Sequence, residues 1–122
     1  MIKSIVQEKS YNFALGVIKL VRKLPKNNEC YVISRQLLKS ATSVGANIEE
    51  ALSGYSKDDF IYKMNLSLKE SAETSYWLRL LKDSELIIGK EVEDLVLESI
   101  EIRKILTSIV KTSKERLKEQ KK

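Results

Sequence analysis

The chain contains no histidine, one cysteine, one proline and four glycines among its 122 residues. Without histidine, Ser–His–Asp triads, most zinc sites and the usual general base near pH 7 are excluded. The four glycines form no phosphate-binding loop pattern. These absences predict a protein that is not an enzyme and that uses no cofactor and no metal.

Long apolar runs are also missing. No run approaches the roughly 18–20 residues that span a bilayer, and the first residues, MIKSIVQEKS, are too polar for a signal peptide. The single cysteine, Cys30, cannot form an internal disulfide and lies on the apolar side of its predicted helix. A buried, inert thiol is therefore favoured over a nucleophile. Together these features predict a cytoplasmic protein that does not enter a membrane.

Apolar residues make up 43% of the chain, and many of them recur at helical spacing. Four segments, at about residues 6–24, 29–52, 57–82 and 91–117, each place apolar side chains on one stripe at 100° per residue. Long amphipathic helices joined by short turns are typical of an antiparallel, up-down-up-down bundle. The sequence therefore predicts an all-α four-helix bundle that forms a single domain over residues 1–122.

The predicted turns are marked by residues with specific backbone or capping roles. Pro25 ends the first helix, because the residue before proline is biased away from helical geometry. Asn28 is expected to cap the second helix and Ser56 the third. Gly54 is the expected left-handed end of the second helix, and Gly89 is expected to turn the chain before the fourth.

Small and polar residues run beside the apolar stripe of the second helix and along one face of the third. Such faces let two helix backbones approach closely, and their polar groups need partners once buried. We predict a buried polar network that fixes the helix register; the alternative interpretation is a polar pocket or a carboxylate pair. The residues of this predicted network are Gln36, Ser40, Ser43, Asn47, Glu50 and Glu73.

The third helix is apolar on two sides, which predicts two burial events, one inside the protomer and one against another copy. The residues predicted for this oligomer interface are Tyr62, Leu66, Trp77, Leu80 and Leu81. Two alternatives stay open. These side chains could lie beneath a loop, or the aromatic ones could stack bases of single-stranded RNA beside Lys63 and Lys69.

The net charge of +5 is concentrated near the two chain ends. Residues 1–26 hold six basic and one acidic side chain, and residues 111–122 hold six basic and two acidic ones. In an up-down bundle both ends lie at the same end of the molecule, where their cations can bind nucleic-acid phosphates. A solvated tail is the alternative. The candidate nucleic-acid-binding residues are Lys3, Lys9, Lys114, Arg116, Lys118, Lys121 and Lys122.

Two segments, QLLKSATSVGANIEEA at 36–51 and FIYKMNLSLKESAET at 60–74, resemble a bacterial family. It is the four-helix-bundle family whose members include proteins encoded within 23S rRNA intervening sequences. One departure is Ala51, where a glycine is common in that family. The matching residues are Gln36, Leu37, Ala41, Ser43, Val44, Asn47, Ile48, Glu50, Phe60, Ser71 and Glu73.

This resemblance implies a four-helix bundle, commonly assembled as a five-fold homo-oligomeric ring, with no known enzymatic activity. A related bundle, the accessory protein of diversity-generating retroelements, is a basic ring that works with a reverse transcriptase and RNA. We therefore expect a non-enzymatic homo-oligomer that is associated with RNA or DNA or serves as a scaffold. The alternative is a protein–protein interaction module with no nucleic-acid role.

Overall fold

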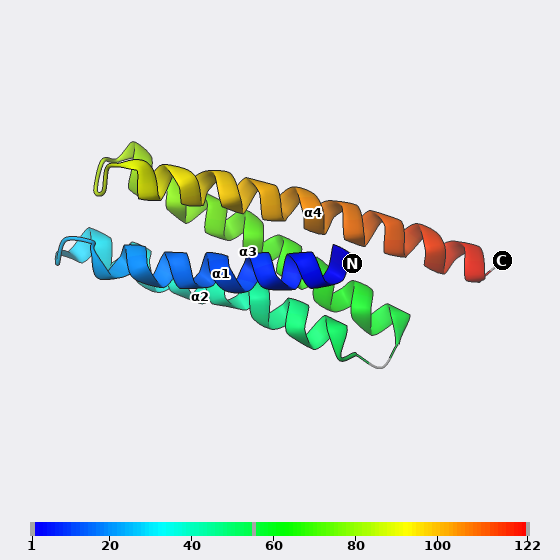
Figure 1. Ribbon diagram of the computed structural model, residues 1–122. Coiled ribbons are helices and arrows are strands. Elements are labelled where there is room, and N and C mark those ends of the chain that lie inside the picture. Colours follow the sequence, from blue (N-terminus) through cyan, green and yellow to red (C-terminus); the bar gives the residue numbers. More distant parts are fainter. Residues whose placement is uncertain (1, 55, 122) are drawn as a thin grey trace.

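The computed structural model describes residues 2–54 and 56–121, with side chains from Ile5 onward, and within these ranges it consists of four helices and no strand. The helices are α1 (Ile2–Arg22), α2 (Asn28–Leu52), α3 (Lys57–Asp83) and α4 (Lys90–Gln120). The predicted all-α, up-down-up-down bundle is confirmed (Figure 1).

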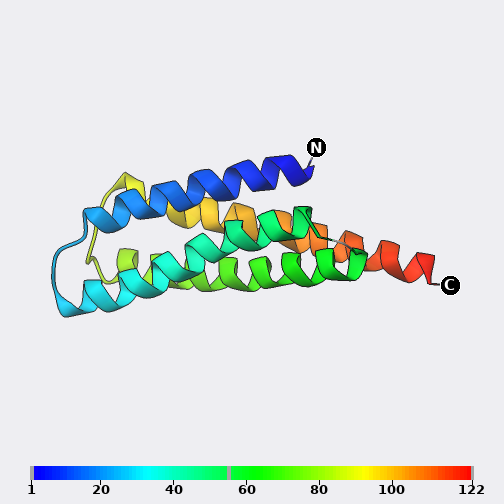
Figure 2. The same ribbon diagram turned by 90° about the horizontal axis from the view of Figure 1, so that it is seen from below.

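Each helix packs antiparallel against its two neighbours around the bundle, in the order α1, α2, α3, α4 and back to α1. The N-terminal end of α1 and the C-terminal end of α4 therefore point the same way. Figures 1 and 2 show that the last turns of α4 extend beyond the end of α1 and beyond the α2–α3 turn. This projecting segment of α4 presents more of its circumference to solvent than the rest of the bundle does.

The apolar stripes meet along the bundle axis, as their spacing predicts. In α4 every third or fourth residue is buried, and the stripe weakens only at Leu117, which is half-buried. Leu86 and Ile87 in the α3–α4 connection pack against the end of the core. The largest fully buried side chains are Val6, Val17, Leu20, Leu37, Val44, Ile48, Met64, Thr74, Leu78, Leu81, Val92 and Leu106.

The helix ends differ from prediction by a few residues. Asn27, not Asn28, caps α2, since its Oδ1 accepts the Cys30 N–H at 2.8 Å. Ser56 caps α3 as predicted, accepting the Asp59 N–H at 3.0 Å. The other helix ends also lie close to their predicted positions, although α1 begins four residues earlier and α4 ends three residues later than expected.

The prediction of a left-handed glycine at the end of α2 was wrong. α2 ends at Leu52, and the next residue, Ser53, caps it with φ −101° and donates its backbone N–H to Glu49 O, so the turn closes without a positive φ at Gly54. The positive φ values lie instead in the α3–α4 connection, at Glu85 (φ 61°) and at Gly89 (φ 120°). Gly89 thus has the chain-turning role expected of it, because a φ of 120° strains any other residue. Among the described helices, none is long and apolar enough to cross a bilayer.

Candidate functional site

The seam between α2 and α3 is closed by small hydroxyl side chains. Ser40 and Thr74 are fully buried, and their oxygens lie 2.9 Å apart across the two helices. Further along, the buried Ser67 hydroxyl donates to the Val44 carbonyl at 2.7 Å. A buried polar seam therefore exists where small residues let the helices approach. Of the six residues predicted for it, only Ser40 is fully buried there.

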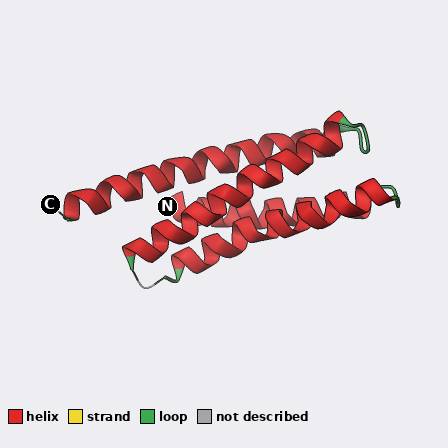
Figure 3. Ribbon diagram, turned by 180° about the vertical axis from the view of Figure 1, so that it is seen from behind, coloured by secondary structure: helices red, strands yellow, loops and turns green. Residues whose placement is uncertain are grey.

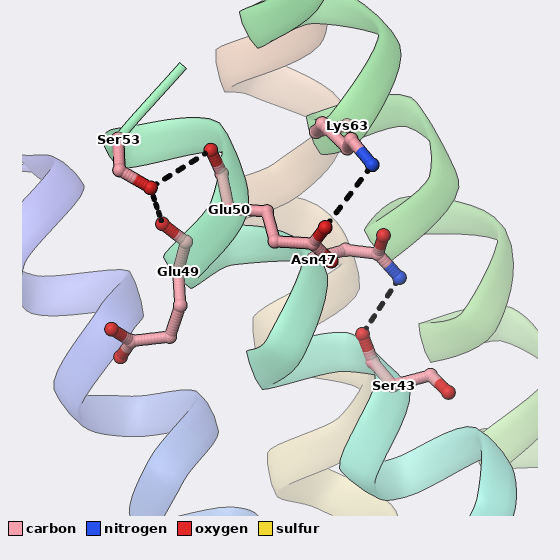
Figure 4. Close-up of polar contacts among 6 residues, drawn as sticks. All are labelled: Ser43, Asn47, Glu49, Glu50, Ser53 and Lys63. Carbon is pink, nitrogen blue, oxygen red and sulfur yellow. Dashed lines mark hydrogen bonds and ion pairs between the residues drawn. The ribbon is translucent and has the colours of Figure 1, made fainter.

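The carboxylates and the glutamine of the predicted network lie elsewhere. Gln36, Glu50 and Glu73 are exposed, so their assignment to a buried network was wrong. The reason is geometric: at 100° per residue Gln36 and Glu50 lie about 40° and 80° from Ser40 on α2, and Glu73 lies about 100° from Thr74 on α3, so these long side chains reach solvent at the edge of the seam. Ser43 and Asn47 are half-buried, and the Asn47 amide donates to the Ser43 carbonyl of its own helix at 2.9 Å (Figure 4).

At the outer edge of this seam Glu50 forms an ion pair with Lys63 of α3, with 3.3 Å between Oε1 and Nζ (Figure 4). Both side chains are partly exposed, so the pair contributes little to stability. Ser53 donates to the carbonyls of Glu49 and Glu50, which satisfies acceptors at the end of α2. These contacts describe a helix end and a surface ion pair, not a pocket.

Two carboxyl groups have pKa values displaced by their surroundings. Partial burial raises the pKa of Glu70 above its ordinary value, and the neighbouring Glu73 carboxylate raises it further, while Lys39 and Lys69 oppose the shift. Within the described residues, no group of three or more acidic or cysteine side chains is arranged to hold a metal ion.

A similar acidic group lies between α1 and α4. Burial raises the pKa of Glu98, Asp94 and Glu101 add to the shift, and Lys9 opposes it. Lys9 Nζ lies 2.6 Å from Glu101 Oε1. The side of α4 that faces α1 is therefore acidic, and Lys9, one of the predicted nucleic-acid-binding residues, is held against it.

The predicted oligomer interface on α3 divides into two groups. Leu81 is fully buried in the protomer core, so its assignment to an outer interface was wrong. It lies three residues after the buried Leu78, which places both on the same helical face. Tyr62 is 60% exposed, and Leu66 and Leu80 are half-buried.

Trp77 packs against the protomer's own core rather than projecting outward. Its ring meets Tyr76 edge to face, with centroids 5.0 Å apart and an interplanar angle of 72°. The indole Nε1 is buried and has no hydrogen-bond partner among the described atoms. Tyr76, which the sequence reasoning did not single out, is 47% exposed and is the outer of the two rings.

The C-terminal cations predicted to bind nucleic acid are exposed on α4. Lys114, Arg116 and Lys118 are exposed, and Lys121 lies 4.0 Å from Asp58 of α3. The side chains of Lys3 and Lys122 lie outside the described residues. The predicted cluster at this end of the bundle is thus brought together only in part, since Lys9 lies on the α1 side in its own ion pair.

A larger basic feature follows one side of α4. At 100° per residue, six exposed cations fall within a sector of about 100°. From residue 100 onward the acidic residues of α4 lie outside this sector, with Glu115 at its edge. We call this feature the α4 basic stripe; its residues are Arg103, Lys104, Lys111, Lys114, Lys118 and Lys121.

The stripe faces the α3 side of the bundle, whereas the acidic side of α4 faces α1. The Lys121–Asp58 contact fixes the first of these orientations and the Lys9–Glu101 pair fixes the second. Arg116, which was predicted together with the lysines, points away from the stripe. It lines an open groove of about 640 Å³ between the end of α4 and the α2–α3 turn.

Sequence reasoning grouped cations by their distance from the chain ends and so missed the three stripe residues nearest the middle of α4. A usable signal was present: Lys104, Lys111 and Lys118 recur every seven residues, a spacing that keeps side chains on nearly the same side of a helix.

Comparison with known proteins adds a family and a structural relative. The family model described as 23S rRNA-intervening sequence protein matches residues 3–108. A similar crystal structure comes from Bacteroides thetaiotaomicron VPI-5482 and is described as a protein with unknown function from the S23 ribosomal protein family. The two chains are 43% identical with a TM-score of 0.83, and the alignment covers 91% of this chain and 99% of the other. The comparison with curated proteins found no match.

Proposed function

The chain belongs to the 23S rRNA-intervening sequence protein family, and from that premise we propose that it is a non-enzymatic, homo-oligomeric bundle that binds nucleic acid through phosphate contacts. The observation that carries the proposal is the α4 basic stripe. Its six cations lie on one side of a helix, over 19 residues or about 27 Å. A row of cations of this kind attracts a polyanion through counterion release and reads no base sequence.

The electrostatic setting supports the same proposal. Within the described residues Lys121 is the one stripe cation with a carboxylate oxygen within 4.0 Å, and its partner Asp58 is itself exposed. Asp94, Glu98 and Glu101 of α4 gather on the side that faces α1. Over residues 103–121, a strand lying along the stripe therefore meets cations and passes Glu115 only at the edge of the sector.

Oligomerisation is proposed from Leu66 and Leu80 of α3, which are only half-buried within the protomer and leave part of their apolar surface uncovered. In an oligomer each copy adds one stripe, and several weak contacts on one polyanion strengthen each other through effective concentration. Light scattering at several protein concentrations tests this part. A single monomeric mass at all concentrations refutes it.

Fluorescence anisotropy with labelled structured RNA and single-stranded DNA tests nucleic-acid binding. At about 50 mM salt we expect binding that weakens steeply as salt is added. A triple variant with glutamine at Lys111, Lys114 and Lys118 should lower the slope of log K against log salt by about one unit for each lysine removed. No binding at low salt, or binding that salt does not affect, refutes the proposal.

The matched control removes the same charge from another part of the surface. Lys19, Lys26 and Lys90 are exposed and lie outside the stripe. Glutamine at these three positions gives the same net charge as the stripe variant and should leave both affinity and salt slope nearly unchanged. An equal effect of the two triple variants would mean that overall charge, and not the stripe, attracts the nucleic acid.

A protein–protein interaction module is the second candidate function, and the exposed Tyr62 beside the half-buried Leu66 and Leu80 of α3 favours it. Under this alternative, the stripe variant binds its partners normally. A Tyr62→Ala substitution, which leaves the protomer core intact, would then weaken partner binding without affecting any nucleic-acid binding.

A further inference from the structure

Two exposed tyrosines stand on the outer side of α3, spaced by two intervals of seven residues. Tyr62 is 60% exposed and Tyr76 47% exposed, and the exposed Lys69 lies midway between them. At 100° per residue these three positions fall within about 40° of one another, and the tyrosines are about 21 Å apart along the helix. The rings therefore mark two points on one line, with a cation between them.

This line runs beside the α4 basic stripe. Asp58 shares the outer sector of α3 with Tyr62, and it contacts Lys121 of the stripe at 4.0 Å. Because α3 and α4 are antiparallel, equal steps along both helices place Tyr62 level with about residues 113–117 of α4 and Tyr76 with about residues 99–103. Figure 3, which looks onto α3, shows the two helices side by side along this face.

The surroundings of the Tyr76 ring restrict its movement. Tyr76 rests edge to face on Trp77, which is itself packed against the core. Lys63 Nζ lies 6.0 Å from the centroid of the Tyr62 ring. Rings that are already positioned lose little conformational freedom when a flat ligand stacks on them.

We propose that Tyr62 and Tyr76 are base-stacking residues, which make the face shared by α3 and the α4 basic stripe selective for single-stranded nucleic acid over duplex. The proposal rests on the phosphate-binding function above and adds the class of ligand. In a single strand the base faces are free to stack on aromatic side chains, while the phosphates reach the neighbouring cations. A duplex offers the same cations only its phosphates, because its bases are already stacked on each other.

The test uses the full chain and three fluorescent probes: oligouridine and oligothymidine of about 15 nucleotides, and a duplex of the same length. The wild type should bind both single strands more tightly than the duplex at equal salt. The double variant Tyr62→Ala/Tyr76→Ala should weaken single-strand binding by about tenfold or more and leave duplex binding and the salt slope unchanged. Comparing the affinities for oligouridine and oligothymidine shows whether the protein prefers RNA or stacks the bases of both strands equally well.

Two control variants make the result specific. Tyr62→Phe/Tyr76→Phe keeps the rings and should retain wild-type affinity. Tyr11→Ala/Tyr31→Ala removes two tyrosines that are each 63% exposed but lie on α1 and α2, and it should have no effect. Wild-type affinity in the Tyr62→Ala/Tyr76→Ala variant, or an equal loss in the Tyr11→Ala/Tyr31→Ala variant, overturns the proposal.

The outcomes distinguish this proposal from the one on which it rests. If the wild type binds in a salt-dependent manner and the lysine variants weaken it while the tyrosine variants do not, phosphate binding stands and the stacking role falls. If the wild type binds none of the probes, both fall. If Tyr62→Ala/Tyr76→Ala changes the oligomeric mass in light scattering and the affinity per assembled protein stays the same, the tyrosines are a contact between copies and the stacking role is again refuted.

Discussion

Removing the hydroxyl contact between Ser40 and Thr74 should cost the protein one hydrogen bond and no more. Thr74 Oγ1 lies 2.9 Å from Ser40 Oγ and 2.7 Å from the carbonyl of Glu70, and Ser40 Oγ lies 3.2 Å from the carbonyl of Leu37. Each hydroxyl has a single hydrogen, so two hydrogens serve three contacts. If either partner is replaced by an apolar residue, the remaining hydroxyl keeps its own backbone carbonyl and is not left unsatisfied.

The expected magnitudes follow from this arrangement. Thr74→Val keeps the shape of the side chain and should lower the free energy of unfolding by about 0.5–1.5 kcal/mol, the net contribution of one hydrogen bond. Ser40→Ala should cost a similar amount. The double variant loses the same bond only once, so its cost should fall short of the sum of the single costs by about 1 kcal/mol. At this chain length 1 kcal/mol corresponds to a Tm shift of about 3–6 °C.

Urea unfolding at one fixed protein concentration measures these values, because oligomerisation makes stability depend on concentration. Far-UV circular dichroism follows the helices, and Trp77 fluorescence follows the α3 core. Thr107→Val is the control, since the Thr107 hydroxyl is exposed and bonds only the Arg103 carbonyl of its own helix. Two results would contradict the reasoning. One is that the free-energy costs of the two single variants add exactly in the double variant. The other is a cost above about 3 kcal/mol for a single variant, because a cost of that size signals a buried polar group left without a partner.

Three further predictions concern other parts of the bundle. Gly45→Ala should stabilise α2 by up to about 1 kcal/mol in urea unfolding, because an added Cβ meets Ser10 Oγ no closer than 3.4 Å. Glu70→Gln should raise Tm slightly at pH 7 and not at all below about pH 4. Burial and the Glu73 carboxylate raise the folded-state pKa of Glu70. The charged form of Glu70 therefore destabilises the fold as pH rises through that pKa, and glutamine removes this charge. Cys30, 2% exposed, should react with a thiol reagent only as fast as the protein unfolds, as absorbance assays of thiol modification can show.

The architecture was predictable because it depends on periodicity, which survives small errors in position. The apolar stripes identified four helices, and Pro25 and Ser56 marked ends that the structure has within a few residues. What failed depended on backbone detail. A glycine just after a helix is typical of a left-handed helix end, and Gly54 has that position. In the structure, however, the turn after α2 closes through Ser53. The pattern of apolar residues is the same for both kinds of helix end, so it could not distinguish them.

The site was less predictable, because burial of a polar side chain depends on small angular differences and on side-chain length. Ser40 and the exposed Gln36 are only four residues apart, but the serine is short enough to stay within the seam. Thr74 was missed because a threonine between Glu73 and Ser75 shows no distinctive pattern in one sequence. The α4 basic stripe was partly missed for a different reason: charge was counted along the chain rather than around the helix.

Family membership and the proposed function rest on different parts of the chain. The family match ends at residue 108, whereas four of the six stripe residues, from Lys111 to Lys121, lie beyond it. The small-residue seam and the exposed Tyr62 and Tyr76 fall within the matched range, as do α2, α3 and α4 up to residue 108. The family therefore accounts for the scaffold and for the outer side of α3, while most of the cations that would hold a phosphate backbone lie on the projecting end of α4. A chain with this family fold that ends near residue 108 would keep the tyrosines and lose most of the stripe, so the proposed nucleic-acid binding depends mainly on residues outside the family match.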